Sequence, residues 1–370
     1  MNKRLLPLLC FSLCLNILTF AQTTDSTAVE EEDYDQYGEV DYADGKANKT
    51  YANARIVGTA PQRFVSVGWD WQAPYTMQLS RIGSYAKDAV LANDQFGSGD
   101  VVSTGGLRLI ANIPVISRNN FIWQLGGTYW ETGYKINNIQ GDSSATGVMN
   151  ELNQKGLRTA GLNTILYKPL NEHQFILVQA SLDMSGDYGL SLQGQTRLSL
   201  AALWGNRPHD RLQWAVGVSR TYRVGAMNYI PIFMYNWTSV NRKWGVEALV
   251  PARGSVRYNF SVTSLLMAGF ELEGQSYRIN NFSDLPAGQN QSLEIRRGEL
   301  RPRIEYQRQL YGFFWIGAQV GYRIDFIYNA DYLPNGKEFF RGFTGAQPFA
   351  MLNNLGNAPY VNLTINFVSP

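Results

Sequence analysis

The residues best suited to chemistry are charged side chains that alternate with apolar ones in the C-terminal third of the chain. Alternation has the two-residue period of a β-strand, so these charges share one face of their strands. The positions that we expect to face inward together are Glu271, Glu273, Arg297, Glu299, Arg301, Arg303, Glu305, Arg323 and Asp325. Paired carboxylates serve as acid and base when burial separates their pKa values, but rows of alternating charge commonly fill barrel interiors. We favour the second interpretation.

Other catalytic signals are weak. The two histidines, His173 and His209, fall in segments that read as short turns. The sequence has no G-x-S-x-G, H-E-x-x-H, phosphate-loop or EF-hand pattern. We therefore predict no catalytic residue, no metal site and no cofactor. The basic residues are interleaved with apolar ones along strands, which also argues against a nucleic-acid partner.

The N-terminus has the pattern of an export signal. Lys3 and Arg4 precede an apolar run from Leu5 to Phe20, and the small residue Ala21 follows. We predict a signal peptide over residues 1–21. Both cysteines, Cys10 and Cys14, lie within it, so residues 22–370 contain none.

An acidic segment follows the predicted signal. Residues 22–44 contain nine acids and no base, so residues 22–50 are predicted to be a disordered periplasmic tail. The rest of the chain, from Gly45 onward, has thirty bases and twenty-one acids, an excess of nine positive charges. The tail is either a solvated leader or a tethered polyanion that enters an Arg-lined lumen or docks on a basic periplasmic partner.

Residues 51–370 are predicted to form a transmembrane β-barrel. After the signal, no stretch approaches the roughly eighteen apolar residues that a membrane helix needs. The last strand alternates strictly, with Val361, Leu363, Ile365 and Phe367 on one face and polar residues on the other. This alternation is typical of outer-membrane barrels of Gram-negative bacteria.

We expect an all-β, antiparallel barrel of fourteen strands, within a range of 12–16. The predicted strands are 63–73, 103–116, 121–136, 156–168, 173–185, 195–205, 211–224, 227–238, 243–250, 254–260, 264–279, 294–308, 313–328 and 358–368. Short connections are assigned to the periplasm, and long ones, including 137–154 and 329–357, to the outside. Residues 76–85 are assigned to the first long loop.

Tryptophans near the short turns are predicted to form an aromatic girdle at the lipid headgroups. They are Trp123, Trp204, Trp214, Trp237 and Trp244. Trp69, Trp71 and Trp130 lie near the other strand ends and suit the outer interface. The expected partners are outer-membrane lipid and lipopolysaccharide.

Several short phrases resemble a Bacteroidetes family of outer-membrane β-barrels known only as a domain of unknown function. They are Tyr235-Asn236 before Trp237, Lys243-Trp244-Gly245, Glu247 followed by Leu249 to Pro251, and Arg257-Tyr258-Asn259-Phe260. The similarity extends over roughly residues 64–367. The resemblance implies a barrel in the outer membrane and no reaction, and no functional residue is carried over from it.

Three functions fit this sequence. The first is a channel or transporter for small solutes, with anion preference from the excess of Arg. The second is a barrel plugged by ion pairs that has a structural role or binds a periplasmic or surface partner. The third is a transporter of hydrophobic ligands, by analogy with other fourteen-stranded barrels. Phe339 and Phe340, in the last long loop, fold inward as a constriction in the first case and face a surface partner in the second.

Overall fold

The computed structural model describes residues 52, 54–83, 96–187, 196–223, 226–280, 292–332 and 350–368. All of them belong to one compact unit, Ala43–Pro370. The predicted signal peptide, the acidic tail and the phenylalanines of the last long loop lie outside the described residues.

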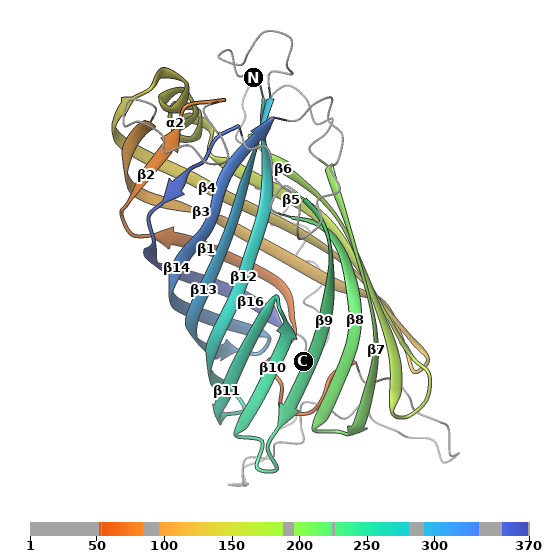
Figure 1. The fold of residues 1–370 in the computed structure, drawn as a ribbon. Coiled ribbons are helices and arrows are strands. Elements are labelled where there is room, and N and C mark those ends of the chain that lie inside the picture. The colour runs from red at the N-terminus through yellow and green to blue at the C-terminus, as the bar shows by residue number, and fades with distance from the viewer. Residues whose placement is uncertain are drawn as a thin grey trace, which may run out of the picture. The chain divides into compact units, whose positions relative to one another are not determined.

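The described residues of this unit form sixteen strands and a helix (Figure 1). In chain order they are β1 (Arg63–Gln72), β2 (Tyr75–Ser80), β3 (Phe96–Arg118), β4 (Phe121–Gly141), α2 (Ser143–Lys155), β5 (Leu157–Pro169), β6 (Gln174–Gly186), β7 (Thr196–His209), β8 (Leu212–Arg223), β9 (Ala226–Thr238), β10 (Trp244–Val250), β11 (Arg253–Ser261), β12 (Ser264–Asn280), β13 (Ser292–Tyr311), β14 (Phe314–Tyr332), β15 (Asn354–Leu355) and β16 (Ala358–Val368).

Fourteen of the strands close into an antiparallel ring, as predicted. Each of β3 to β14 pairs with its neighbours along the chain, and β14 pairs with β16. The ring closes because β1 pairs with β16 on one edge and with β3 on the other. Closure satisfies the edge hydrogen bonds that an open sheet would expose to lipid.

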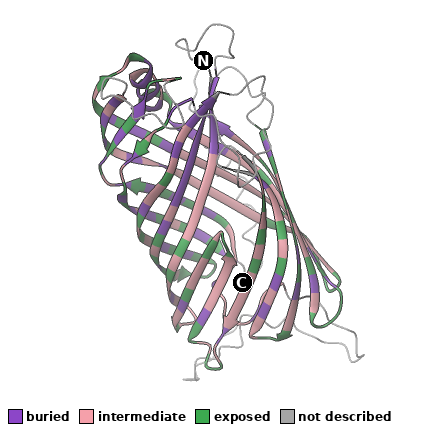
Figure 2. Ribbon diagram, viewed as in Figure 1, coloured by how far each residue is buried: buried purple, intermediate pink, exposed green. Residues whose placement is uncertain are grey.

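The two faces of the wall differ in the way that a membrane barrel requires. Apolar side chains on the outward face are exposed, for example Leu363 at 58%, Val320 at 53% and Leu162 at 68%. Charged side chains on the inward face are buried, including Glu299 and Arg323 at 0%. Figure 2 shows buried residues gathered where β12, β13 and β14 approach the end that carries the long loops, here called the loop end.

Three predicted loops contain secondary structure, one of which, 329–357, includes the end of β14 and the short strand β15. Residues 76–85, assigned to a loop, include most of β2, which continues the line of β1 after a break at Ala73-Pro74 and pairs with β3. Pro74 lacks an N–H for the ladder, which accounts for a break at this point. Another, predicted over 137–154, contains α2, whose N-cap Asp142 accepts hydrogen bonds from the N–H groups of Ser144 and Ala145 at 2.9 and 3.3 Å.

The wall divides toward the loop end. β10 and β11 form a short hairpin whose pairing stops at Leu249–Arg253, so β9 and β12 extend beyond it without a strand between them (Figure 1). Instead, β12 crosses to β6, where Arg278 and Gly186 form a parallel bridge and the N–H of Asp187 donates to the carbonyl of Arg278 at 3.1 Å. This crossing separates the loop end of β7 to β11 from the other strands.

Candidate functional site in the lumen

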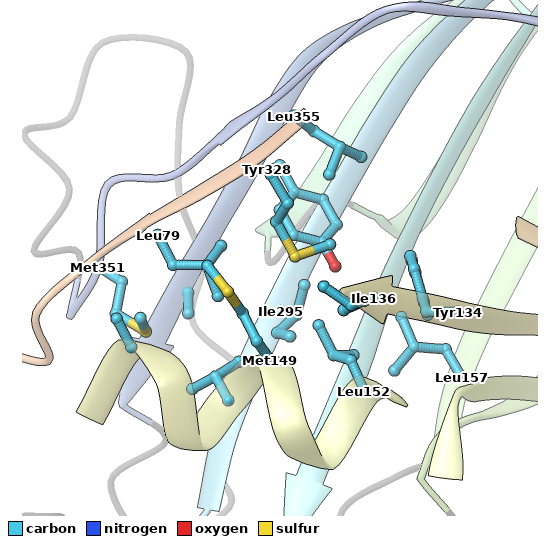
Figure 3. Close-up of a cluster of buried hydrophobic side chains, with 14 of the residues drawn as sticks. Leu79, Tyr134, Ile136, Met149, Leu152, Leu157, Ile295, Tyr328, Met351 and Leu355 are labelled. Atoms are coloured by element: carbon cyan, nitrogen blue, oxygen red, sulfur yellow. The ribbon is translucent and has the colours of Figure 1, made fainter. Parts of the chain in front are cut away.

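The loop end is closed by a hydrophobic cluster, here called the cap cluster. Its helix α2 contributes one apolar face, Ala145, Val148, Met149 and Leu152, at the spacing of successive helical turns. Figure 3 shows Met149 and Leu152 pointing toward side chains of β2, β4, β13 and β14, among them Leu79, Ile136, Ile295 and Tyr328. All six are at most 4% exposed. The cap cluster thus fills the barrel at this level as a soluble protein core does.

Below the cap cluster, charged side chains connect strands across the lumen. Glu299 on β13 accepts hydrogen bonds from the Nε atoms of Arg297 at 2.6 Å and Arg301 at 3.0 Å. Arg323 of β14 lies 3.6 Å from the same carboxylate. Three guanidinium groups therefore surround one fully buried carboxylate, which offsets the desolvation of both signs.

This network also includes residues of β12, which pairs with β13, and of β1 and β3, which lie beyond β16 in the ring. Arg301 also lies 2.9 Å from Glu273 of β12 and 3.5 Å from Asp70 of β1. Arg108 of β3 pairs with Asp70 at 3.0 Å and with Glu273 at 3.2 Å. Four arginines and three carboxylates are thus linked, which leaves the network with one positive charge, so most of the positive excess of the chain lies outside it.

Five of the nine predicted inward residues belong to this network: Glu273, Arg297, Glu299, Arg301 and Arg323. Asp70 and Arg108 were not predicted, although each stands between two apolar residues in a predicted strand. Trp130, expected at the outer interface, instead faces inward, with the Arg108 guanidinium 5.4 Å from its ring centroid.

The other four predicted residues lie apart from the network. Arg303 pairs with Glu271, and Glu305 pairs with Arg63. Asp325 stands opposite Glu299 in the β13–β14 register but forms no ion pair with any described residue.

The wall formed by β5 to β9 carries small polar side chains instead. Ser199 of β7 hydrogen-bonds Thr221 of β8 at 3.0 Å, and Ser181 donates to Asp183 on β6 at 3.3 Å. Gln179, on the inward face of β6, is exposed to solvent. The part of the lumen beside β5 to β9, here called the chamber, is therefore accessible to water.

The short-turn end is crossed by residues 54–62, here called the strap. The N–H of Val57 donates to the carbonyl of Asp210 in the β7–β8 turn at 3.0 Å. The N–H of Ala60 donates to Glu247 of β10 at 2.9 Å, and Asn259 of β11 donates to the carbonyl of Gly58 at 3.3 Å. Each contact is to a different part of the ring.

Small apolar contacts complete the closure by the strap. Ala60 packs with inward residues of β12, β14 and β16, including Trp315, which is 4% exposed. Ala54 packs against the cluster formed by Tyr167, Phe175 and Leu203 on β5 to β7. The strap therefore occupies the mouth of the barrel at the short-turn end.

The five tryptophans predicted to form a girdle lie near the strand ends next to the short turns. The rings of Trp204 and Trp214 meet edge to face with centroids 5.7 Å apart, and Trp244 is 50% exposed. Trp123 donates its indole N–H to Thr164 at 2.8 Å. Trp237 pairs with Val246 of β10 in the ladder.

A closed ring of fourteen antiparallel strands with an apolar outer face defines a transmembrane β-barrel of the outer-membrane type. No described helix has the length and apolar character needed to cross a membrane. The described residues also contain no group of three or more His, Cys, Asp or Glu side chains placed to hold a metal ion.

The chain belongs to the family described as "Domain of unknown function (DUF6268)", whose model matches residues 128–368. A comparison with curated proteins gives no match. The chain is similar to solved β-barrels, including an outer membrane channel from Pseudomonas putida F1, with 13% identity, a TM-score of 0.33 and coverage of 90% of this chain and 100% of that one. It is also similar to the P. putida toluene transporter TodX, with 9% identity, a TM-score of 0.29 and coverage of 85% and 92%.

Proposed function

We propose that this protein is a gated outer-membrane channel for small, anionic solutes, exported by its N-terminal signal, with the short turns in the periplasm. The supporting observation is the chamber, which holds solvent-accessible polar side chains between a closed loop end and a strap of nine residues. A barrel with a purely structural role needs no such space. We also retain the prediction of Bacteroidetes origin.

The strap is the seal that we expect to open. It is held by a few hydrogen bonds and small apolar contacts, whereas the cap cluster buries large side chains from many elements. Because the acidic tail directly precedes the strap, a periplasmic partner that binds the tail would pull on the strap. Lipid and lipopolysaccharide surround the barrel in this proposal.

A non-enzymatic role is part of the proposal. His173 lies in the β5–β6 turn and His209 at the end of β7, both at the short-turn end and exposed. Seven of the eight acids on the described inward faces named above, all but Asp325, form an ion pair or a hydrogen bond with Arg or Ser. Such pairing favours charged carboxylates over the split pair that acid–base catalysis requires.

Single-channel recording from two truncated chains in a planar bilayer tests this function. A chain lacking residues 22–60 has lost most of the strap and is expected to give ohmic current steps. In a salt gradient, its reversal potential should shift toward the equilibrium potential of the anion. The matched control lacks residues 22–50, keeps the strap and is expected to stay mostly closed. A heat-dependent gel shift confirms that each barrel has folded.

Silence from a folded barrel without its strap would contradict the channel and favour the second function. In that case the paired charges and both seals describe a plugged barrel that binds a partner. A cation-shifted reversal potential would keep the channel and overturn its anion preference.

A further inference from the structure

The interruption of the wall above the β10–β11 hairpin lies at the outer edge of the apolar band. On β12 the outward residues Leu266, Ala268, Phe270 and Leu272 are apolar, whereas Gly274 has no side chain and Ser276, the next residue of the same parity, is buried. The tip of the β10–β11 hairpin lies beside Leu272, the last of these apolar residues, because the N–H of Leu272 donates to the carbonyl of Ala252 at 2.8 Å. The interruption therefore begins where the bilayer surface is expected, not in its hydrocarbon core.

The strand edges on both sides of the interruption are not joined to each other. β9 pairs with β10 from Phe233 onward, which leaves residues 226–232 without a strand on that side. β12 pairs with β11 up to Glu271, and its next described β-bridge on that side joins Arg278 to Gly186 of β6. The upper part of the interruption is filled, since Ser276 and Arg278 are buried and Arg197 of β7 lies 3.4 Å from Glu294 of β13. Inward side chains on this part of β9, such as Ile230, are half-buried, whereas Ile279 in the cap cluster is 0% exposed.

Positive side chains stand at the lower rim of the interruption. Arg253 begins β11 at the hairpin tip, is exposed, and shares the inward parity of the buried Arg257. It forms no hydrogen bond or ion pair with any described residue. Arg303, paired with Glu271, stands on the neighbouring part of the inner wall.

We propose that the interruption is a side port, bounded by residues 226–232 of β9, the hairpin tip and residues 272–275 of β12, which are partly exposed, and that small water-soluble anions pass through it between the chamber and the outside. Arg253 is its selectivity residue. The cap cluster then stays closed during transport, because the route runs beneath it and not through it. This inference rests on the proposed channel and names its outer opening.

Chemical modification tests the port without requiring transport. Gln179→Cys, in a chain that keeps its strap, places a thiol in the chamber, and residues 22–370 offer no other cysteine. We expect a small anionic methanethiosulfonate to modify this thiol faster than a cationic reagent of similar size. Arg253→Glu should reverse that preference severalfold, because it replaces a positive charge at the rim by a negative one. The matched control, Met149→Cys in the cap cluster, should resist both reagents.

A disulfide across the cap separates the two possible routes. A Cβ at Gly97 of β3 would lie 2.8 Å from the Cβ of Ala145 on α2. Gly97→Cys with Ala145→Cys can therefore form a disulfide once α2 moves away from β3 by about 1 Å, to the usual Cβ–Cβ distance of about 3.8 Å. In the chain lacking residues 22–60, oxidation of this pair should leave the current unchanged.

The inference is overturned if the thiol at position 179 does not react, if Arg253→Glu leaves both rates unchanged, or if the locked cap abolishes the current. These three results are distinct from the result that would contradict the channel, which is the absence of current from the folded chain lacking residues 22–60. Reaction at position 179 with no current from the strap deletion would keep the port and remove the transport proposal.

Discussion

The two ends of this barrel are closed by different means. At the loop end, helix α2 and strands from both halves of the chain pack large apolar side chains into the cap cluster. At the short-turn end, the strap lies across the mouth through a few hydrogen bonds, two alanine contacts and one large buried side chain, Ile56, which is 4% exposed. Buried apolar area sets the free energy needed to separate packed elements, so the strap should open far more readily than the cap.

The largest expected effect comes from the charge network that stands between the two seals. Glu299→Ala leaves Arg297, Arg301 and Arg323 without their shared carboxylate and should lower the free energy of unfolding by about 3–5 kcal/mol. Urea unfolding in detergent micelles or liposomes measures this. Glu271→Ala is the control, since its side chain is 40% exposed, and it should have a much smaller effect. Equal effects would show that the network does not depend on Glu299.

Loosening the cap cluster should have the next largest effect. Leu152→Ala removes a side chain that is 1% exposed and should lower stability by about 2–5 kcal/mol if the cap unfolds together with the barrel. The side port predicts that the folded variant keeps the same channel current. A larger current with the same ion preference would instead indicate that solutes pass through the cap cluster.

Weakening the strap should lower the free energy of unfolding less than Leu152→Ala does, but should raise the open probability of the channel more. Asn259→Ala removes the hydrogen bonds to the carbonyls of Gly58 and Arg242, which are 3.3 and 2.8 Å long, at a loss of about 1 kcal/mol. Single-channel recording should show a higher open probability than in the full chain. Asn241→Ala is the control, since Asn241 lies beside Arg242 in the β9–β10 turn but contacts no described residue of the strap.

The smallest effect is a pH dependence at the start of α2. Burial by itself would raise the pKa of Asp142, but hydrogen bonds from Ser144 and Ala145 lower it below its usual value. Its stabilising contribution is therefore complete above the pKa of the unfolded chain and is lost as the pH falls through the lower pKa of the folded state. Asp142→Ala should cost about 1 kcal/mol near neutral pH and progressively less in acid. The rate of proteolysis within α2, measured for both chains as a function of pH, tests this prediction. A difference in rate between Asp142→Ala and the natural chain that grows as the pH falls would contradict it.

The ring of strands was predictable because each wall strand has an outward face against lipid and an inward face against the lumen. That difference gives the sequence a two-residue period, which determined the parity of Glu299, Arg301 and Arg303. The number of strands was predicted as fourteen within a range of 12–16, and the structure confirms fourteen in the ring. The same rule, applied to Trp69, Asp70 and Trp71, would have predicted Asp70 as an inward residue.

Helix α2 was missed although the sequence carries its signals. Asp142 is a good N-cap, Gly156 follows the last helical residue, and Ala145, Val148, Met149 and Leu152 have helical spacing. They were read as part of a long loop because the barrel pattern predicts loops at that end. The strap could not be predicted, since residues 54–62 have no periodicity and their partners are far away in the chain.

The sequence by itself determined the parts that depend on local alternation: the strands, their two faces, the girdle tryptophans and the charges of the inner wall. The tertiary structure decided which charges meet, that β12 leaves β11 and crosses to β6, and that the strap returns into its own barrel. These outcomes depend on contacts between residues distant in sequence, whose free energies are set by the closed ring and not by any local pattern.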